Sequence, residues 1–148
     1  MYNIIESFRQ SLNDMLSVRE MDSAQFGKEL GIDASVVRRW RNNAIDVRLK
    51  TLIRFADFFK CSIEYLCGKT HEYNIIEKQA TYQNFGERLQ VVMKESGVKP
   101  FQLFRNTKII PSKYYYWISG GEPSLTSLEM LAEYLNVTLD YLIGRQKT

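Results

Sequence analysis

The 148-residue chain has few of the residues that build disulfide scaffolds, metal sites or catalytic centres. Its two cysteines, Cys61 and Cys67, are too few for a disulfide framework. The chain has a single histidine, His71. Two cysteines and one histidine are too few ligands for a structural metal site. No glycine-rich phosphate loop is present, and acidic and serine residues are scattered. We therefore expect no enzyme activity, no metal and no cofactor.

Long apolar runs and a secretory leader are also lacking. No apolar stretch reaches the roughly 18 residues of a membrane span. Residues 1–10 lack the positively charged start and apolar block of a signal peptide, so we expect a cytoplasmic protein without membrane contact. Only three prolines and eight glycines occur, so few residues interrupt helices. The net charge of +3 is modest, so any basic surface must be local.

The most informative feature that is present is an internal repeat. Phe8 corresponds to Phe85 at an offset of 77 residues, and Leu66 corresponds to Leu142 at an offset of 76. One residue is therefore missing from the second copy between positions 117 and 128, which predicts a loop there. The repeat pairs each cysteine with an aliphatic residue, which predicts buried and unreactive thiols. These pairs are Cys61 with Val137 and Cys67 with Ile143.

Each copy has the apolar spacing of five helices, and no run alternates like a strand. Apolar residues at three- and four-residue steps predict a helix from about residue 4. The further predicted helices of this copy cover 23–30, 34–42, about 49–59, and a short segment between Ser62 and Gly68. The second copy predicts helices at about 81–95, 100–106, 111–119, 125–134 and 139–143. Asp22 and Asp33 suit N-caps, and Gly31 suits a sharp helix end.

The predicted fold class is all-α, with two tandem five-helix domains. We place the first domain at 1–69, a connector at 70–81 and a divergent second domain at 82–148. The connector is polar apart from Ile75 and Ile76, and whether part of it is helical stays open. Two short helices around a tight turn in each copy indicate a helix-turn-helix.

Residues 26–40 carry a family resemblance. The segment Phe-Gly-Lys-Glu-Leu-Gly-Ile-Asp-Ala-Ser-Val-Val-Arg-Arg-Trp resembles the helix-turn-helix of the lambda-repressor-like family, of the Cro/repressor or XRE type. Segments 62–68 and 138–144 resemble the last helix of that family. The resemblance covers nearly the whole chain twice and is looser in the second copy. It implies a transcriptional regulator that binds double-stranded DNA, and related proteins usually bind as dimers.

The helix predicted at 34–42 has one face suited to a major groove. Val37 and Trp40 are its large apolar residues and should face the core. The opposite face carries Ser35, Arg38, Arg39 and Asn42. Arginine can bind guanine through two hydrogen bonds and asparagine can bind adenine in the same way. Residues at the start of such a helix come nearest the bases, which adds Ala34. The resemblance independently implies Ala34, Ser35 and Arg39.

Four more residues of the first copy are candidates for phosphate contact. Arg48 and Lys50 follow the loop after this helix, where phosphate contact and simple solvent exposure are both open. Ser23 and Gln25 begin the preceding helix, whose N–H groups could hold a phosphate, although helix capping explains them equally well.

The second copy departs from the family pattern at its turn. Phe104 replaces Gly27 and Lys108 replaces Gly31, so we expect a rearranged or wider turn. The outward candidates of the following helix are Ser112, Lys113, Tyr115 and Tyr116. Contact with DNA, contact with protein and a purely structural role all stay open for them.

The sequence thus predicts a sequence-specific DNA-binding transcriptional regulator of the repressor kind, whose first copy reads the major groove. The alternative is a protein-interaction or antitoxin-like module that keeps the fold, with the second copy serving dimerisation. A homodimer fits both hypotheses, and no small-molecule ligand is indicated.

Overall fold

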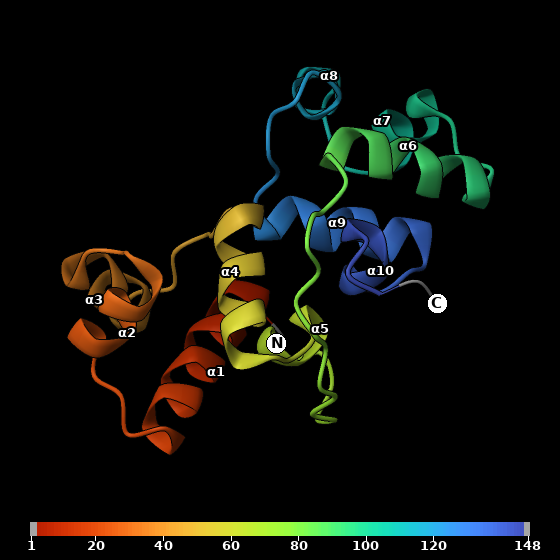
Figure 1. The fold of residues 1–148 in the computed structure, drawn as a ribbon. Helices are drawn as coiled ribbons and strands as arrows, with labels where there is room; N and C mark the ends of the chain where they lie inside the picture. The colour runs from red at the N-terminus through yellow and green to blue at the C-terminus, as the bar shows by residue number, and fades with distance from the viewer. Residues whose placement is uncertain (1–2, 147–148) are drawn as a thin grey trace.

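The computed structural model describes residues 3–146 and places ten α-helices within them. In these residues the only β-type pairing is an isolated bridge between Arg48 and Ser124. The first module contains α1 (Ile4–Val18), α2 (Ser23–Leu30), α3 (Ala34–Asn42), α4 (Leu49–Phe59) and α5 (Ile63–Leu66). The second contains α6 (Phe85–Ser96), α7 (Pro100–Asn106), α8 (Pro111–Ile118), α9 (Leu125–Leu135) and α10 (Leu139–Ile143). The prediction of two tandem five-helix units is confirmed (Figure 1).

Local capping sets the bounds of α2 and α3. The Asp22 side chain accepts a hydrogen bond from the Gln25 N–H, and the Gln25 side chain accepts one from the Asp22 N–H, both at 2.8 Å. Gly31 ends α2 in the left-handed region at φ +68°, where a residue without Cβ is not strained. Asp33 then caps α3 through the Ser35 N–H at 2.8 Å. These caps fix the angle at which α3 leaves α2.

The region between the modules differs from the sequence prediction. Helix α6 begins at Phe85, not near residue 81, because the Asn84 side chain accepts the Gly86 N–H at 2.9 Å and so caps the helix there. Residues 70–84 contain no helix and run as an extended strap beside the first module (Figure 1). The strap is attached by the Ile76 N–H, which donates to the Lys60 carbonyl at 3.1 Å.

Aromatic rings dominate the core of the first module. Phe26 of α2 packs edge-on against Phe55 of α4 with ring centroids 5.1 Å apart, and it stacks on Phe59 at 5.6 Å. Trp40 of α3 meets Phe55 edge-on at 5.3 Å. Val37 is fully buried, so Val37 and Trp40 attach α3 to the core as predicted. The face of α3 that points to solvent follows from these two contacts.

Both cysteines are buried free thiols, as the repeat predicts. Burial raises the pKa of the Cys61 thiol to about 12, because the thiolate would lose its hydration in the core. Burial also raises the pKa of Cys67.

The two modules share one continuous set of buried residues. Between them, the Leu49 N–H donates to the Pro123 carbonyl at 3.0 Å, and the Leu125 N–H donates to the Val47 carbonyl at 2.8 Å. These bonds join the segments that lead into α4 and α9, and α5 also packs against α10. The relative placement of α3 and α8 therefore depends on direct contacts between the modules as well as on the strap.

Candidate nucleic-acid interface

The outer face of α3 gathers four of the predicted residues. Ser35, Arg38, Arg39 and Asn42 are all exposed, whereas Val37 on the opposite face is fully buried. Ala34 is half-buried at the start of the helix. The face thus combines two guanidinium groups, an amide and a hydroxyl on a rigid helix, which is the set of donors and acceptors that can hydrogen-bond base edges.

The two guanidinium groups of this face are not held by directional contacts within the described residues, although the Arg38 charge lies near Asp33. Among residues 3–146, neither the Arg38 nor the Arg39 side chain forms a hydrogen bond or salt bridge. Both residues are exposed, so their N–H groups remain available for an acceptor. Two unpaired guanidinium groups on neighbouring positions form a local positive charge that the modest net charge of the chain does not show.

Ser35 is already engaged at the N-terminus of α3. Its hydroxyl donates to the Asp33 carboxylate at 2.6 Å, in addition to the backbone contact with the same oxygen. The Ser35 hydroxyl, the backbone bond and the nearby Arg38 charge lower the pKa of Asp33. Asp33 therefore stays ionised at neutral pH and puts one negative charge beside the arginines.

Arg41 points the other way and is a structural residue. Its Nε donates to Asn13 Oδ1 at 2.7 Å, and one terminal nitrogen donates to Ser23 Oγ at 3.1 Å. It therefore ties α3 to α1 and α2. Ser23, a predicted phosphate contact, is buried by this arrangement, and its oxygen is occupied as an acceptor. Gln25 is exposed but serves the N-cap of α2.

Gly27 makes the close approach of α2 and α3 possible. A Cβ atom at this position would lie 2.4 Å from the Ile32 carbonyl oxygen, so the turn excludes any side chain here. The contact holds the start of α3 against the middle of α2. The direction of the exposed arginines consequently depends on a glycine that faces the interior.

Arg48 and Lys50 lie at the junction of the modules. Both side chains are exposed at the start of α4, and Arg48 is the N-cap residue. Lys50 Nζ lies 3.9 Å from Glu122 of the second module, with most of the lysine side chain in solvent.

The turn of the second module is rearranged, as Phe104 and Lys108 predict. Helix α7 ends at Thr107 in extended backbone, where α2 ends on a left-handed glycine. The Thr107 hydroxyl donates to the Leu103 carbonyl at 2.6 Å and accepts the Ile109 N–H at 3.0 Å. A threonine side chain thus holds the turn that glycine forms in the first module. Phe104 fills the space beside it by packing edge-on against Tyr114 at 5.7 Å.

Helix α8 exposes tyrosines where α3 exposes arginines. Tyr115 and Tyr116 are more than half exposed, and Ser112 and Lys113 beside them are exposed. Tyr114 and Trp117 on the opposite face are buried. The ring of Tyr116 lies over Gly121, where an added Cβ would come within 2.3 Å of it. Tyr116 is therefore held against the following loop while about half of its surface stays exposed.

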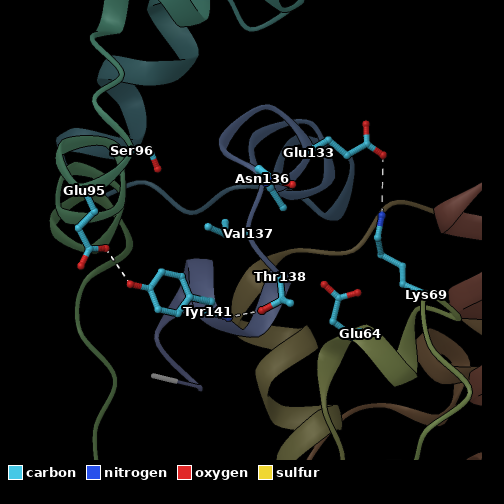
Figure 2. A pocket seen from close by; sticks show the side chains of 10 residues that line it. Glu64, Lys69, Glu95, Ser96, Glu133, Asn136, Val137, Thr138 and Tyr141 are labelled. Carbon is cyan, nitrogen blue, oxygen red and sulfur yellow. Dashed lines mark hydrogen bonds and ion pairs between the residues drawn. The ribbon is translucent and has the colours of Figure 1, made fainter. Parts of the chain in front are cut away.

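A cavity of about 680 Å³ lies between the modules, away from α3. Glu64, Glu95 and Glu133 line it, as Figure 2 shows, together with Lys69 and Tyr141. Tyr141 donates to Glu95 at 2.8 Å, and Glu133 lies 3.8 Å from Lys69. These acidic groups would repel a nucleic acid and already have partners within the protein. The cavity belongs to the contact between the modules.

The residues that sequence reasoning missed hold the two modules together. Arg145 is fully buried, 2.9 Å from Asp140 and 3.0 Å from Asp57. Burial opposes its charge, but the Tyr82 hydroxyl and the two carboxylates raise its pKa overall. The repeat contains a pattern that could have pointed to this network. Lys69 and Glu64 of the first copy correspond to Arg145 and Asp140 of the second at an offset of 76, so a basic and an acidic residue recur together.

No helix in the part of the chain that the structure describes is long and apolar enough to cross a membrane. Searches among curated proteins and among solved structures found no match. A family model described as the Cro/C1-type HTH DNA-binding domain matches the chain twice, at residues 11–68 and 88–147. The two matches cover more than half of the chain and coincide with the two copies of the repeat. The protein therefore belongs to the Cro/C1-type helix-turn-helix family of DNA-binding regulators, with two tandem copies of the domain.

Proposed function

We propose that the protein is a sequence-specific transcriptional repressor whose α3 enters the major groove of duplex DNA. The observation that carries the proposal is the pair of exposed guanidinium groups of Arg38 and Arg39, on the helix face opposite the buried Val37. Among residues 3–146 these groups form no hydrogen bond or salt bridge. A major groove admits one α-helix, and arginine on its exposed face can form two hydrogen bonds with a guanine.

The other residues of the first module take supporting roles in this proposal. Asn42 and Ser35 hydrogen-bond to bases or to nearby phosphates, and Ala34 contacts a thymine methyl group. Gln25 at the N-terminus of α2 lies where a phosphate would meet the backbone N–H groups of that helix, and Ser23 acts through Arg41. Arg48 and Lys50 contact phosphates near the junction and set the register of the protein on the duplex.

The test is selection of binding sequences from a random duplex library, followed by titrations with the selected site. Wild type is compared with the double variant Arg38→Ala/Arg39→Ala. Loss of arginine contacts to bases should cost about 1–3 kcal/mol of discrimination at each contacted base pair. A reporter gene placed downstream of the selected site then distinguishes repression from activation.

The matched control removes the same charge elsewhere. Lys78 lies in the strap and Lys94 in α6, and both are exposed. The variant Lys78→Ala/Lys94→Ala should therefore keep the base preference of the wild type. Weak, salt-sensitive binding without any preferred sequence would contradict the proposal.

A second candidate function is a protein-interaction or antitoxin-like module, and one observation favours it. The second module exposes Phe101, Ile110, Tyr115 and Tyr116, each by more than half of its surface. Exposed aromatic residues are enriched in protein interfaces, including those of homodimers. This function predicts that Arg38→Ala/Arg39→Ala leaves biological activity intact, whereas Tyr115→Ala and Phe101→Ala abolish it.

A further inference from the structure

The contacts between the modules occur in reciprocal pairs. Leu49 donates to Pro123, and Leu125 donates to Val47 at the equivalent positions, each pair shifted by 76 residues. The ends of α5 and α10 repeat this exchange. Asp140 accepts the Ile63 N–H at 2.9 Å, and Glu64 accepts the Leu139 N–H at 2.7 Å. Each module therefore caps the short last helix of the other with a carboxylate.

Two further pairs follow the same rule. Arg145 pairs with Asp57 at 3.0 Å, and their counterparts Lys69 and Glu133 lie 3.8 Å apart. Lys69 also lies 3.5 Å from Glu129, whose counterpart in the first module is Ile53. The Thr126 backbone N–H donates to the Asp46 carboxylate at 3.3 Å. Their counterparts Lys50 and Glu122 also meet, through the Lys50 Nζ and the Glu122 carboxylate at 3.9 Å. All four pairs exchange under a single shift of 76 residues, which is the signature of an isologous interface around a two-fold axis.

This internal two-fold axis relates α3 to α8. A rotation leaves the height of a point along its axis unchanged, so the two helices lie at the same height on either side of the axis. The loop after each of them leads directly to the paired segments 47–49 and 123–125, which mark the axis. In Figure 1, α3 and α8 flank the place where α4 and α9 meet.

The α7–α8 hairpin carries charge that suits DNA. Residues 98–121 contain four basic residues and no acidic residue. The four are Lys99, Arg105, Lys108 and Lys113. All are exposed, and among residues 3–146 none forms a salt bridge. An unneutralised basic hairpin attracts the phosphate backbone, and exposed tyrosines beside it can contact sugars and phosphates.

We infer that the two modules of a single chain take the places of the two subunits of a dimer. One chain then binds two adjacent half-sites of one duplex, with α3 at the first and α8 at the second. The inference rests on the proposed function of α3. The two halves are unequal. The α3 half-site is read by arginine contacts to bases, whereas the α8 half-site is bound mainly through phosphates. The operator is accordingly non-palindromic, with strict sequence in one half and loose sequence in the other.

The test measures stoichiometry and footprint on the selected duplex. Sedimentation or native mass spectrometry should give one chain per duplex. Hydroxyl-radical footprinting should show two protected segments, with centres separated by about one helical turn, ~34 Å, or a multiple of it. Two chains on a palindromic site, or protection of a single segment, would overturn the inference while leaving base reading by α3 in place.

The variant Lys108→Ala/Lys113→Ala tests the second half-site directly. It should keep the selected sequence but lose protection of the loose half. The slope of log affinity against log salt should become shallower by about 2, so raising salt from 50 to 200 mM costs the wild type about tenfold more affinity than the variant. An unchanged slope, with loss of binding to a protein partner, would assign the hairpin to that partner. Absence of any preferred sequence in the wild type would instead reject the proposed function.

Discussion

At the scale of single residues, the absence of a side chain at Gly27 sets how closely α2 and α3 pack. Replacing Gly27 by alanine puts a Cβ atom 2.4 Å from the Ile32 carbonyl oxygen, and a backbone atom cannot move aside as a flexible side chain can. We expect Gly27→Ala to lower the free energy of unfolding by about 1–3 kcal/mol, as overpacked sites do. DNA binding should weaken too, because α3 is displaced. Urea unfolding measures the first effect.

The neighbouring exposed residue Lys28 provides the control for this change. Lys28→Ala should alter stability by no more than about 0.5 kcal/mol, as surface substitutions in helices do. Equal stability of the two variants would show that the turn relaxes to accept a side chain.

The buried thiol of Cys61 gives a prediction in alkali. An unfolded thiol ionises near its usual pKa of 9.0, whereas the folded thiol keeps its proton up to about pH 12. Ionisation therefore favours the unfolded chain as pH rises from 9 to 12, and the free energy of unfolding falls. The variant Cys61→Val, which copies Val137 of the other module, should show a smaller fall. Urea unfolding at a series of pH values makes the comparison.

Thiol labelling checks the same residue at neutral pH. At pH 8 a disulfide reagent such as Ellman's should leave both cysteines unmodified until urea unfolds the chain. Rapid labelling in native buffer would contradict the buried and protonated state.

At the scale of helices, local rules predicted most of the fold. Helices α2, α3 and α10 have the predicted bounds, because Asp22, Asp33 and Thr138 cap them within a few residues of chain. The apolar periodicity puts the start of α6 too early and does not decide whether the strap contains a helix. Both depend on which backbone groups find partners, as with Ile76 on Lys60, and such contacts are not visible in periodicity.

Substitutions of Asp33 at the N-terminus of α3 separate the effect of its helix cap on stability from the effect of its charge on DNA binding. Asn is as good an N-cap as Asp, so Asp33→Asn should preserve stability, whereas Asp33→Ala should cost about 1 kcal/mol. Asp33→Asn also removes a negative charge from the face that is proposed to meet phosphates. We expect tighter DNA binding, with a larger gain at low salt, measured by fluorescence anisotropy. Unchanged affinity at low salt would place Asp33 away from the DNA.

At the scale of the whole molecule, the repeat predicted two modules but not how they meet. Exposed candidates such as Arg38 and Tyr115 followed from helical geometry within one copy. The roles of Arg41 and Arg145 did not, because their partners lie in other helices or in the other module. Placing both copies in one alignment shows which residues correspond, whereas only the structure shows that corresponding surfaces face each other. The domain bounds of 1–69 and 82–148 stay a prediction.

The reciprocal caps between the modules are equivalent in position but differ in their surroundings. The Asp140 side chain is fully buried and binds Arg145 as well as the first residues of α5. Glu64 is half-exposed, and its side chain binds only the first residue of α10. Asp140→Ala leaves a buried guanidinium short of one partner and should cost about 3–5 kcal/mol. Glu64→Ala removes a cap alone and should cost about 1 kcal/mol. Equal costs in urea unfolding would mean that the buried network does not hold the modules.

The same pair of variants connects stability with DNA binding. Two linked sites gain affinity only while their geometry allows both to engage one duplex. Under conditions where both variants remain folded, loosening the contact at Asp140 should weaken binding to the complete site. Binding to a duplex that carries only the α3 half-site should not change. Glu64→Ala should change the ratio of affinity for the complete site to affinity for the α3 half-site less than Asp140→Ala does. The reason is that the Arg145 network still fixes the angle between α3 and α8. If the ratio is the same in wild type and both variants, each module engages DNA independently of the internal interface.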